Sequence, residues 1–152
     1  MMNWSLAYEQ NFKCKDMEIR TIDDICNAGF EIIKNASVPG NVEIDLMREG
    51  KLPDIYFSTN TLEAQKLENM HYWYFTEIEI EDTESYLRFE GIDTIADIYV
   101  NGNLAEVCDN MFQAYDVYSN FNKGKNEIVV HIKPVCIEAR QYTAPVGTSS
   151  QK

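Results

Sequence analysis

Carboxylates are the most numerous candidates for acid–base chemistry in this chain, but the sequence does not arrange them in facing pairs. Acid–base hydrolysis requires two carboxyl groups held about 5 to 9 Å apart on a rigid frame. Glu77, Glu79 and Glu81 alternate along one extended segment and therefore share one face of a strand. Asp23 and Asp24 stand beside a predicted turn. We interpret both groups as solvated charge rather than as catalytic residues.

One Asn-Glu pair and two histidines are the other candidates for chemistry. Asn126-Glu127 resembles the Asn-Glu pair of many retaining glycosidases, but it follows Gly124 at a turn and opens a strand, which favours a structural role. His71 ends a predicted helix, where the helix dipole favours a cation, and His131 points outward from a predicted strand. The two histidines are isolated from each other, and no cysteine lies at metal-ligand spacing from them. We therefore expect no catalytic residue, no metal site and no cofactor in this chain.

Two aromatic residues, Trp73 and Phe75, lie on the strand face that continues as the three glutamates. An apolar patch beside charge is typical of an interface, so these rings are candidates for docking against another domain. Exposed aromatic rings also stack on the apolar faces of sugars, which makes the same rings candidates for sugar binding. The third interpretation is burial beneath a loop of the same domain. The sequence leaves these three interpretations open.

Length and charge limit the kinds of protein that this chain can be. Its 152 residues make one domain, which we place at residues 1–142, followed by a flexible tail at residues 143–152. The 25 acidic and 13 basic residues leave a net charge of −12, which repels nucleic acids and anionic membrane surfaces. No apolar run approaches the roughly 20 residues that span a bilayer, and the N-terminus lacks the features of a signal peptide, which favours a cytoplasmic location. No two of the four cysteines have the C-x-x-C spacing of a zinc or redox site, so we expect reduced thiols.

Hydrophobic residues alternate with a period of two through the second half of the chain, which is typical of half-buried strands. The predicted strands are 72–81, 86–90, 95–100, 103–108, 115–119 and 127–133. Asn101-Gly102 separates two of them and suits the positive φ angles of a two-residue hairpin turn. Pro134 ends the last one, because proline cannot donate a hydrogen bond to a strand partner. Short strands joined by tight turns indicate an antiparallel sandwich or barrel.

The first half of the chain is less regular. Residues 3–10 and 16–21 could each form a strand. Short helices are predicted over 42–49 and 61–69, because each segment has a capping or stop signal at an end. Between them, residues 51–60 form a predicted loop. The expected fold class is therefore all-β, with two short helices in the first half.

A series of short motifs runs in a recognisable order from residue 36 to residue 134. The motifs are Ala36-Ser37-Val38-Pro39-Gly40-Asn41-Val42, Asp45-Leu46, Gly50, Leu52-Pro53-Asp54, Trp73-Tyr74, Phe89-Glu90-Gly91-Ile92-Asp93-Thr94, Ala96, Asn101-Gly102, Asp109-Asn110-Met111-Phe112, Tyr115 and Asp116-Val117. In this order they resemble the N-terminal sugar-binding domain of the family 2 glycoside hydrolases, and within that family the β-mannosidase-like branch. The resemblance depends on the ordered series rather than on any single motif.

The resemblance implies an antiparallel β-sandwich of the jelly-roll, galactose-binding-like type, in agreement with the alternation described above. It also implies two partners within the intact enzyme, namely an immunoglobulin-like domain and a (β/α)8 barrel that holds both catalytic glutamates. This chain is then an accessory domain of a glycosidase and is inactive alone, because those glutamates lie elsewhere in the enzyme. Two alternatives remain open: a self-standing, non-catalytic carbohydrate-binding module, and a structural oligomerisation domain.

The resemblance further implies that a loop of this domain reaches the rim of the enzyme's sugar-binding site. Asp54, Tyr56 and Asn60 are the candidate rim residues in that loop. Ile55 and Thr61 stand where the mannosidase-like pattern has Pro and Glu. In such an enzyme, the two aromatic residues of the 72–81 strand are candidates for docking on a neighbouring domain.

Overall fold

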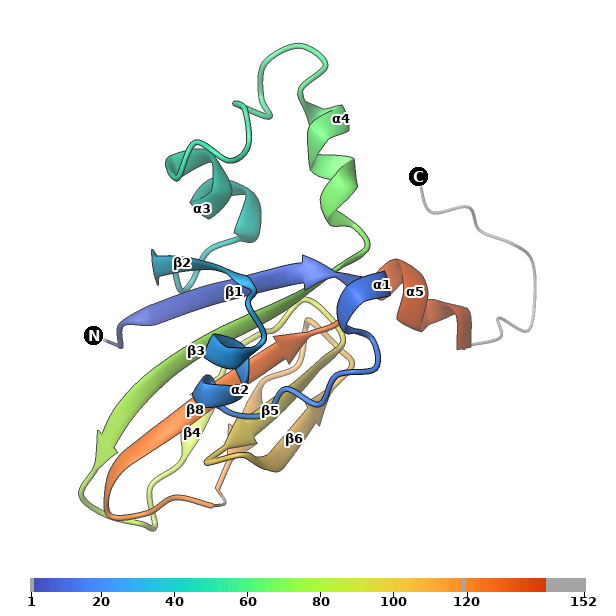
Figure 1. The fold of residues 1–152 in the computed structure, drawn as a ribbon. Helices are drawn as coiled ribbons and strands as arrows, with labels where there is room; N and C mark the ends of the chain where they lie inside the picture. Colours follow the sequence, from blue (N-terminus) through green and yellow to red (C-terminus); the bar gives the residue numbers. More distant parts are fainter. Residues whose placement is uncertain (1, 119, 142–152) are drawn as a thin grey trace.

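In the computed structural model the described residues are 2–118 and 120–141, and they form two antiparallel β-sheets that pack face to face (Figure 1). The larger sheet has six strands in the order β2-β1-β3-β8-β5-β6, and the smaller sheet pairs β4 with β7. The strands are β1 (Trp4–Gln10), β2 (Glu31–Ala36), β3 (Met70–Ile80), β4 (Leu87–Phe89), β5 (Ala96–Val100), β6 (Asn103–Cys108), β7 (Tyr115–Val117) and β8 (Gly124–Ile132). This architecture confirms the expected all-β antiparallel sandwich. The tail that we expect at residues 143–152 lies outside the described residues.

Strand β3 lies in the interior of the large sheet, where it pairs with β1 on one side and with β8 on the other. Trp73 of β3 lies opposite Ala7 of β1 and opposite His131 of β8. Asn101 and Gly102 have φ angles of 51° and 75° and form the predicted turn between β5 and β6. Apart from their end residues, the strands of the second half agree with the period-two prediction.

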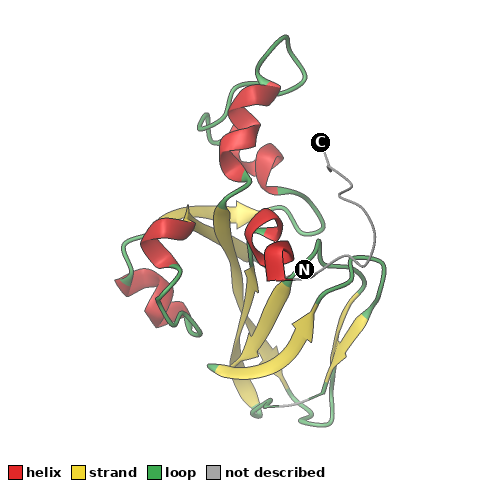
Figure 2. Ribbon diagram, turned by 90° about the vertical axis from the view of Figure 1, so that its right-hand side faces the viewer, coloured by secondary structure: helices red, strands yellow, loops and turns green. Residues whose placement is uncertain are grey.

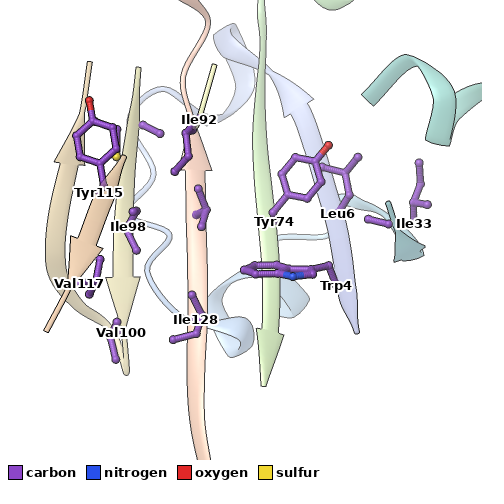
Figure 3. Close-up of a cluster of buried hydrophobic side chains, with 14 of the residues drawn as sticks. Trp4, Leu6, Ile33, Tyr74, Ile92, Ile98, Val100, Tyr115, Val117 and Ile128 are labelled. Atoms are coloured by element: carbon purple, nitrogen blue, oxygen red, sulfur yellow. The ribbon is translucent and has the colours of Figure 1, made fainter. Parts of the chain in front are cut away.

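The inner face of the large sheet, which faces β4 and β7, forms the main hydrophobic core (Figure 3). Leu6, Tyr74 and Ile128 contribute to this core from three strands of the large sheet. Tyr115 and Val117 of β7 pack against it from the small sheet. Burial of these apolar side chains is what holds the two sheets together.

The outer face of the large sheet is covered by residues 11–30, a segment between β1 and β2 that we call the N-terminal cover. It contains two short helices, α1 (Asn11–Cys14) and α2 (Ile22–Asn27) (Figure 1). The cover and the sheet together form a second hydrophobic core. Its buried residues are Ala7, Cys14, Ile19, Ile25, Phe30, Trp73, Phe75 and Val129. The middle of the large sheet is therefore buried on both faces.

The N-terminal cover corrects the prediction of a strand over residues 16–21. Residues 16–20 lie in no helix or strand, although Ile19 is buried in the second core. Thr21 instead begins α2 with a capping box, because its hydroxyl accepts from the Asp24 backbone N–H at 3.0 Å and the Asp24 carboxylate accepts from the Thr21 N–H at 2.9 Å. Such a reciprocal pair satisfies two of the N–H groups that a helix start leaves free. The strand β2 that follows the cover was not predicted from the alternation.

Residues 37–69 project from the edge of the large sheet, and we call this segment the arm (Figure 2). It contains α3 (Val42–Arg48), α4 (Thr61–Ala64) and the 3-10 turn η1 (Gln65–Leu67). Asn41 caps α3, because its side-chain oxygen accepts from the Ile44 backbone N–H at 3.0 Å. The two helices expected in the first half are thus present, the second as α4 continued by η1.

Three helices are additional to the two expected ones. Two of them, α1 and α2, belong to the N-terminal cover. The third, α5 (Val135–Glu138), follows β8 after Pro134 and is continued by the 3-10 turn η2 (Ala139–Gln141). Within the described residues, no helix combines the length and the apolar character needed to cross a bilayer.

Candidate functional site

The tip of the arm brings the three predicted rim residues together in one compact loop. The carboxylate of Asp54 accepts a hydrogen bond from the Tyr56 backbone N–H at 3.0 Å, and the Asn60 side-chain amide donates to the Asp54 carbonyl at 2.9 Å. The side chains of Asp54 and Asn60 therefore stabilise the conformation of the loop itself. Tyr56 is 80% exposed, and its neighbour Phe57, which sequence reasoning did not single out, is 71% exposed. Two adjacent aromatic residues in an otherwise polar loop are the signal that could have found Phe57.

The base of the arm is fixed by a buried carboxylate, Asp45 of α3. Asp45 accepts hydrogen bonds from the Ser37 backbone N–H at 3.0 Å and from the Ser37 hydroxyl at 2.9 Å, and it forms an ion pair with Arg48 at 2.8 Å. These bonds hold the turn that contains the cis Val38–Pro39 peptide at the start of the arm. A fully buried carboxylate needs such partners, so Asp45 is a positioning residue for the arm. In the sequence, Asp45 stands out only as part of the family motif Asp45-Leu46.

A groove of about 970 Å³ lies below the arm, on the inner face of the large sheet. Its floor includes Trp4, Tyr72, Tyr74 and Val130, and charged residues at its edge include Arg88, Glu90, Asp93 and Lys133. The residues of the Val38–Pro39 turn and of α5 also line it. Grooves of roughly 300 to 1,000 Å³ with aromatic walls and a few polar groups are the usual size of small-molecule sites.

The tyrosines of the groove floor are neutral hydrogen-bonding groups. Burial raises the pKa of both Tyr72 and Tyr74 well above the ordinary value, and the negative charges of Glu43 and, for Tyr74, Asp45 act in the same direction. The Tyr72 hydroxyl donates to the Leu67 carbonyl of η1 at 2.9 Å, which ties the arm to the sheet. The floor therefore offers rings and hydroxyls but no charge.

Trp73 and Phe75 do not lie on the surface. Their exposed fractions are 1% and 9%, and both side chains belong to the second core beneath the N-terminal cover. Trp73 is stacked between Phe30 and His131, with ring centroids 4.7 Å apart on each side. The structure thus favours the third interpretation, burial beneath a segment of the same domain. It corrects the interpretation of these rings as exposed residues for docking or sugar stacking.

The expectation that the two histidines are isolated is wrong. His71 lies in β3 rather than at a helix end, and its Nδ1 is 2.8 Å from Nε2 of His131 in the adjacent strand β8. His131 does lie on the outer face, as predicted, but the N-terminal cover closes that face. Burial, together with the Lys133 ammonium, lowers the pKa of His71 to about 4, and burial, His71 and Lys133 lower the pKa of His131 to about 3. Within the described residues, no group of three or more His, Cys, Asp or Glu side chains could hold a metal ion.

The Asn-Glu pair has the structural role that we expect from its position. Asn126 is buried and stabilises the turn before it. Its side-chain oxygen accepts a hydrogen bond from the Asn122 backbone N–H at 2.7 Å, and its side-chain amide donates to the Gly124 carbonyl at 2.9 Å. The Glu127 carboxylate accepts from the Ile22 backbone N–H at 3.2 Å and so anchors α2 of the cover. Both residues therefore stabilise the fold.

The fold and the family match indicate the same class of domain. A β-sandwich in which a six-stranded sheet faces a smaller one is the architecture of galactose-binding-like domains. The family described as "Glycosyl hydrolase 2 galactose-binding domain-like" matches residues 10–151, and the chain belongs to this family. This confirms the family resemblance and extends it beyond residues 36 to 134.

The relatives are much longer than this chain. It is 30% identical over 97 residues to an exo-β-D-glucosaminidase of Amycolatopsis orientalis, which covers 59% of this chain and 9% of the enzyme. It is 31% identical over 98 residues to β-mannosidase B of Thermothelomyces thermophilus, which covers 60% of this chain and 12% of the enzyme. The crystal structure of a β-D-mannosidase from Dictyoglomus thermophilum superposes with a TM-score of 0.70 at 26% identity, covering 99% of this chain and 18% of that one. The chain thus spans about a tenth of the curated relatives that it matches and corresponds to one domain of larger multidomain proteins.

Proposed function

We propose that this chain is the non-catalytic N-terminal accessory domain of a family 2 β-glycosidase whose activity resides in other domains. The observation that carries the proposal is the correspondence of nearly the whole chain to 18% of a β-D-mannosidase. Similar proteins are named as β-mannosidases and exo-β-D-glucosaminidases, so the substrate class of the parent protein is a β-linked mannoside or glucosaminide.

In this proposal the arm is the part of the domain that meets the catalytic domain. Tyr56 and Phe57 are exposed at the tip, where burial in an interface would be favourable. The bonds among Asp54, Tyr56 and Asn60 hold the loop in one shape, which suits a loop at the rim of a sugar-binding site. The proposed partners are a (β/α)8 barrel that holds both catalytic glutamates, and an immunoglobulin-like domain.

The first test measures catalysis by the chain alone. We expect no turnover of aryl β-mannosides or aryl β-glucosaminides above background, because the proposal places both catalytic carboxylates in the barrel. Turnover that copurifies with the folded chain would contradict the assignment of an accessory role.

The second test measures docking of the chain on the rest of the parent protein, supplied as a separate polypeptide. Truncation of a ring buried at an interface costs on the order of 2 to 4 kcal/mol, so Tyr56→Ala or Phe57→Ala should weaken association about 30-fold or more. Phe112→Ala is the matched control, because Phe112 is also largely exposed but lies outside the arm, between β6 and β7. An equal loss of affinity in the control, or no loss in the arm variants, would show that the arm does not form the interface.

A self-standing carbohydrate-binding module is the second candidate, and the aromatic floor of the groove favours it. Trp4 lines the groove, whereas Trp73 lies in the second core on the other side of the sheet. Sugar binding in the groove should therefore change the fluorescence of Trp4 and leave that of Trp73 unchanged. Titration of manno-oligosaccharides against the wild type and against Trp4→Phe distinguishes the two functions. A saturable shift that Trp4→Phe abolishes supports the module, and the absence of any shift supports the accessory role.

A further inference from the structure

The histidine pair, His71 and His131, joins the N-terminal cover to the sheet through a chain of hydrogen bonds. Nε2 of His71 lies 2.9 Å from the side-chain oxygen of Asn11 in α1. An amide oxygen only accepts, so Nε2 of His71 carries the proton and its Nδ1 is left as an acceptor. Nε2 of His131, 2.8 Å from that Nδ1, is then the donor. Both imidazoles are neutral in this arrangement and both carry their proton on Nε2.

The same pair belongs to a stack of aromatic rings that crosses from the cover to the sheet. Phe30 of the cover stacks on Trp73, and Trp73 in turn stacks on His131 and lies nearly parallel to His71. The centroid separations are 4.7, 4.7 and 5.8 Å. The cover therefore contacts the histidine pair directly through Asn11 and indirectly through Phe30, which packs on Trp73.

The carboxylates opposite the pair on the neighbouring strands are each paired with a lysine. Glu9 lies opposite His71 on β1 and forms an ion pair with Lys13 at 3.0 Å. Asp97 lies opposite His131 on β5 and forms an ion pair with Lys133 at 2.7 Å. The ammonium of Lys133 disfavours a positive charge on either imidazole.

The other titratable groups of the second core remain uncharged. They are the Cys14 thiol of α1 and the Tyr99 hydroxyl of β5. Burial raises the pKa of Cys14 to about 11 and also raises the pKa of Tyr99. On β8 the Glu127 carboxylate is bound to the backbone N–H of Ile22. No element that packs on the pair thus brings an unbound carboxylate against it within the described residues.

We propose that the histidine pair is an acid-sensitive contact that releases the N-terminal cover from the sheet when the pair takes up a proton. A proton on Nδ1 of His71 removes the lone pair that accepts from His131. It also places a charge in a buried site near the Lys133 ammonium, and both the burial and that ammonium disfavour the charge. These two residues are the only histidines of the chain, and neither lies in the main core, so the sandwich itself stays folded.

The test compares amide hydrogen exchange of the full 152-residue chain at pH 7.5 and at pH 5.0, expressed as protection factors. An imidazole that stays neutral in the closed state and titrates near 6.5 in the open state shifts the equilibrium about 30-fold at pH 5.0. We expect amides of residues 11–30 to lose protection by at least about 10-fold and to be much less protected at pH 5.0 than those of β5 and β8, which remain folded. Equal protection of all three segments at pH 5.0, or no loss in the cover, would overturn the proposal.

The matched control is the double variant His71→Phe/His131→Phe, which keeps two rings in the stack and removes both titrating groups. We expect its cover to show the same protection at both pH values. A loss of protection at pH 5.0 in this variant would assign the acid response to other groups and refute the proposal.

A measurement on the wild-type chain does not depend on how the variant folds. Imidazole ¹⁵N spectra at pH 7.5 should show both rings as the neutral form protonated on Nε2. Neither ring should titrate near 6.5 while the cover is closed. A histidine with the proton on Nδ1, or one that titrates near its ordinary pKa without any change in the cover, would contradict the proposed contact.

Discussion

The two faces of the large sheet are completed in different ways. The outer face is closed by the N-terminal cover, a segment of the same chain that buries Trp73 and Phe75. The inner face packs on β4 and β7 over part of its area and continues into the groove below the arm. The outer face thus serves the stability of the domain, whereas the groove and the arm are the surfaces on which it can meet other molecules.

This difference explains why aromatic residues have opposite roles on neighbouring segments. On β3, Trp73 faces the cover and is inaccessible, while Tyr72, one residue earlier, lines the groove. Tyr56 and Phe57 at the arm tip are largely exposed. Mutations should therefore divide into those that unfold the domain and those that leave it folded and alter contacts.

The largest effect is expected from Trp73→Ala, in the middle of the second core. Removal of a fully buried aromatic side chain costs about 3 to 5 kcal/mol, which urea unfolding can measure. Tyr72→Ala is the matched change on the groove side and should cost less, because that ring is only partly enclosed. Equal losses for the two variants would remove the distinction between the faces.

A smaller effect is expected from Asp45→Ala at the base of the arm. The change leaves the half-buried N–H and hydroxyl of Ser37 without their acceptor, which should cost about 2 kcal/mol in the free energy of unfolding. Asp54→Ala at the exposed tip is the control and should cost less than about 1 kcal/mol. Thermal unfolding of both variants checks this ranking, and a larger loss of stability in Asp54→Ala than in Asp45→Ala would contradict it.

Acid should destabilise the outer face through the histidine pair. The pKa values of His71 and His131 in the folded chain, about 4 and about 3, lie below the ordinary value near 6.5, so the unfolded chain binds more protons below that pH. Stability is therefore complete above about pH 6.5 and falls as the pH decreases towards 4, by about 2 kcal/mol per histidine at pH 5. Urea unfolding at pH 7.5 and pH 5.0 measures this loss.

The variant Lys133→Met sharpens the pH prediction. It frees the Asp97 carboxylate next to His131 and removes the ammonium that lowers both pKa values. The loss of stability at pH 5.0 should therefore be smaller than in the wild type. A variant with an unchanged or larger loss would show that Lys133 does not control the histidines.

The smallest effect on stability is expected at the arm tip. Phe57→Ala and Tyr56→Ala should change the free energy of unfolding by no more than about 0.5 kcal/mol, because both side chains are mostly in solvent. Their effect should instead appear in the docking experiment. A loss of several kcal/mol in the isolated chain would show that the tip packs on the domain itself.

Local patterns in the sequence predicted much of the fold. The alternation of Tyr72, Tyr74 and Ile80 marks β3, and Asn101-Gly102 marks the hairpin turn, because each depends on neighbours a few residues away. The first half was predicted less well. Residues 16–21 resemble a strand locally, but Thr21 and Asp24 form a helix cap. Such a cap depends on hydrogen bonds of the side chains, and the alternation of apolar residues does not predict these.

The candidate site was predicted in part for the same reason. Asp54, Tyr56 and Asn60 are close in sequence, so one loop brings them together. The groove could not be predicted, because Trp4, Tyr72 and Arg88 come from distant parts of the chain. The buried carboxylate of Asp45 was not distinguished from the many acidic residues at the surface.

By itself, the sequence determined the family, the strands of the second half and the absence of strong positive charge, since these depend on residue types and short spacings. Only the tertiary structure decided which face of β3 is buried and which residues meet there. His71 and His131 are 60 residues apart in sequence and become neighbours because β3 and β8 pair in one register. The N-terminal cover converts a half-exposed strand face into a second core, because apolar side chains from residues 11–30 fold back over it.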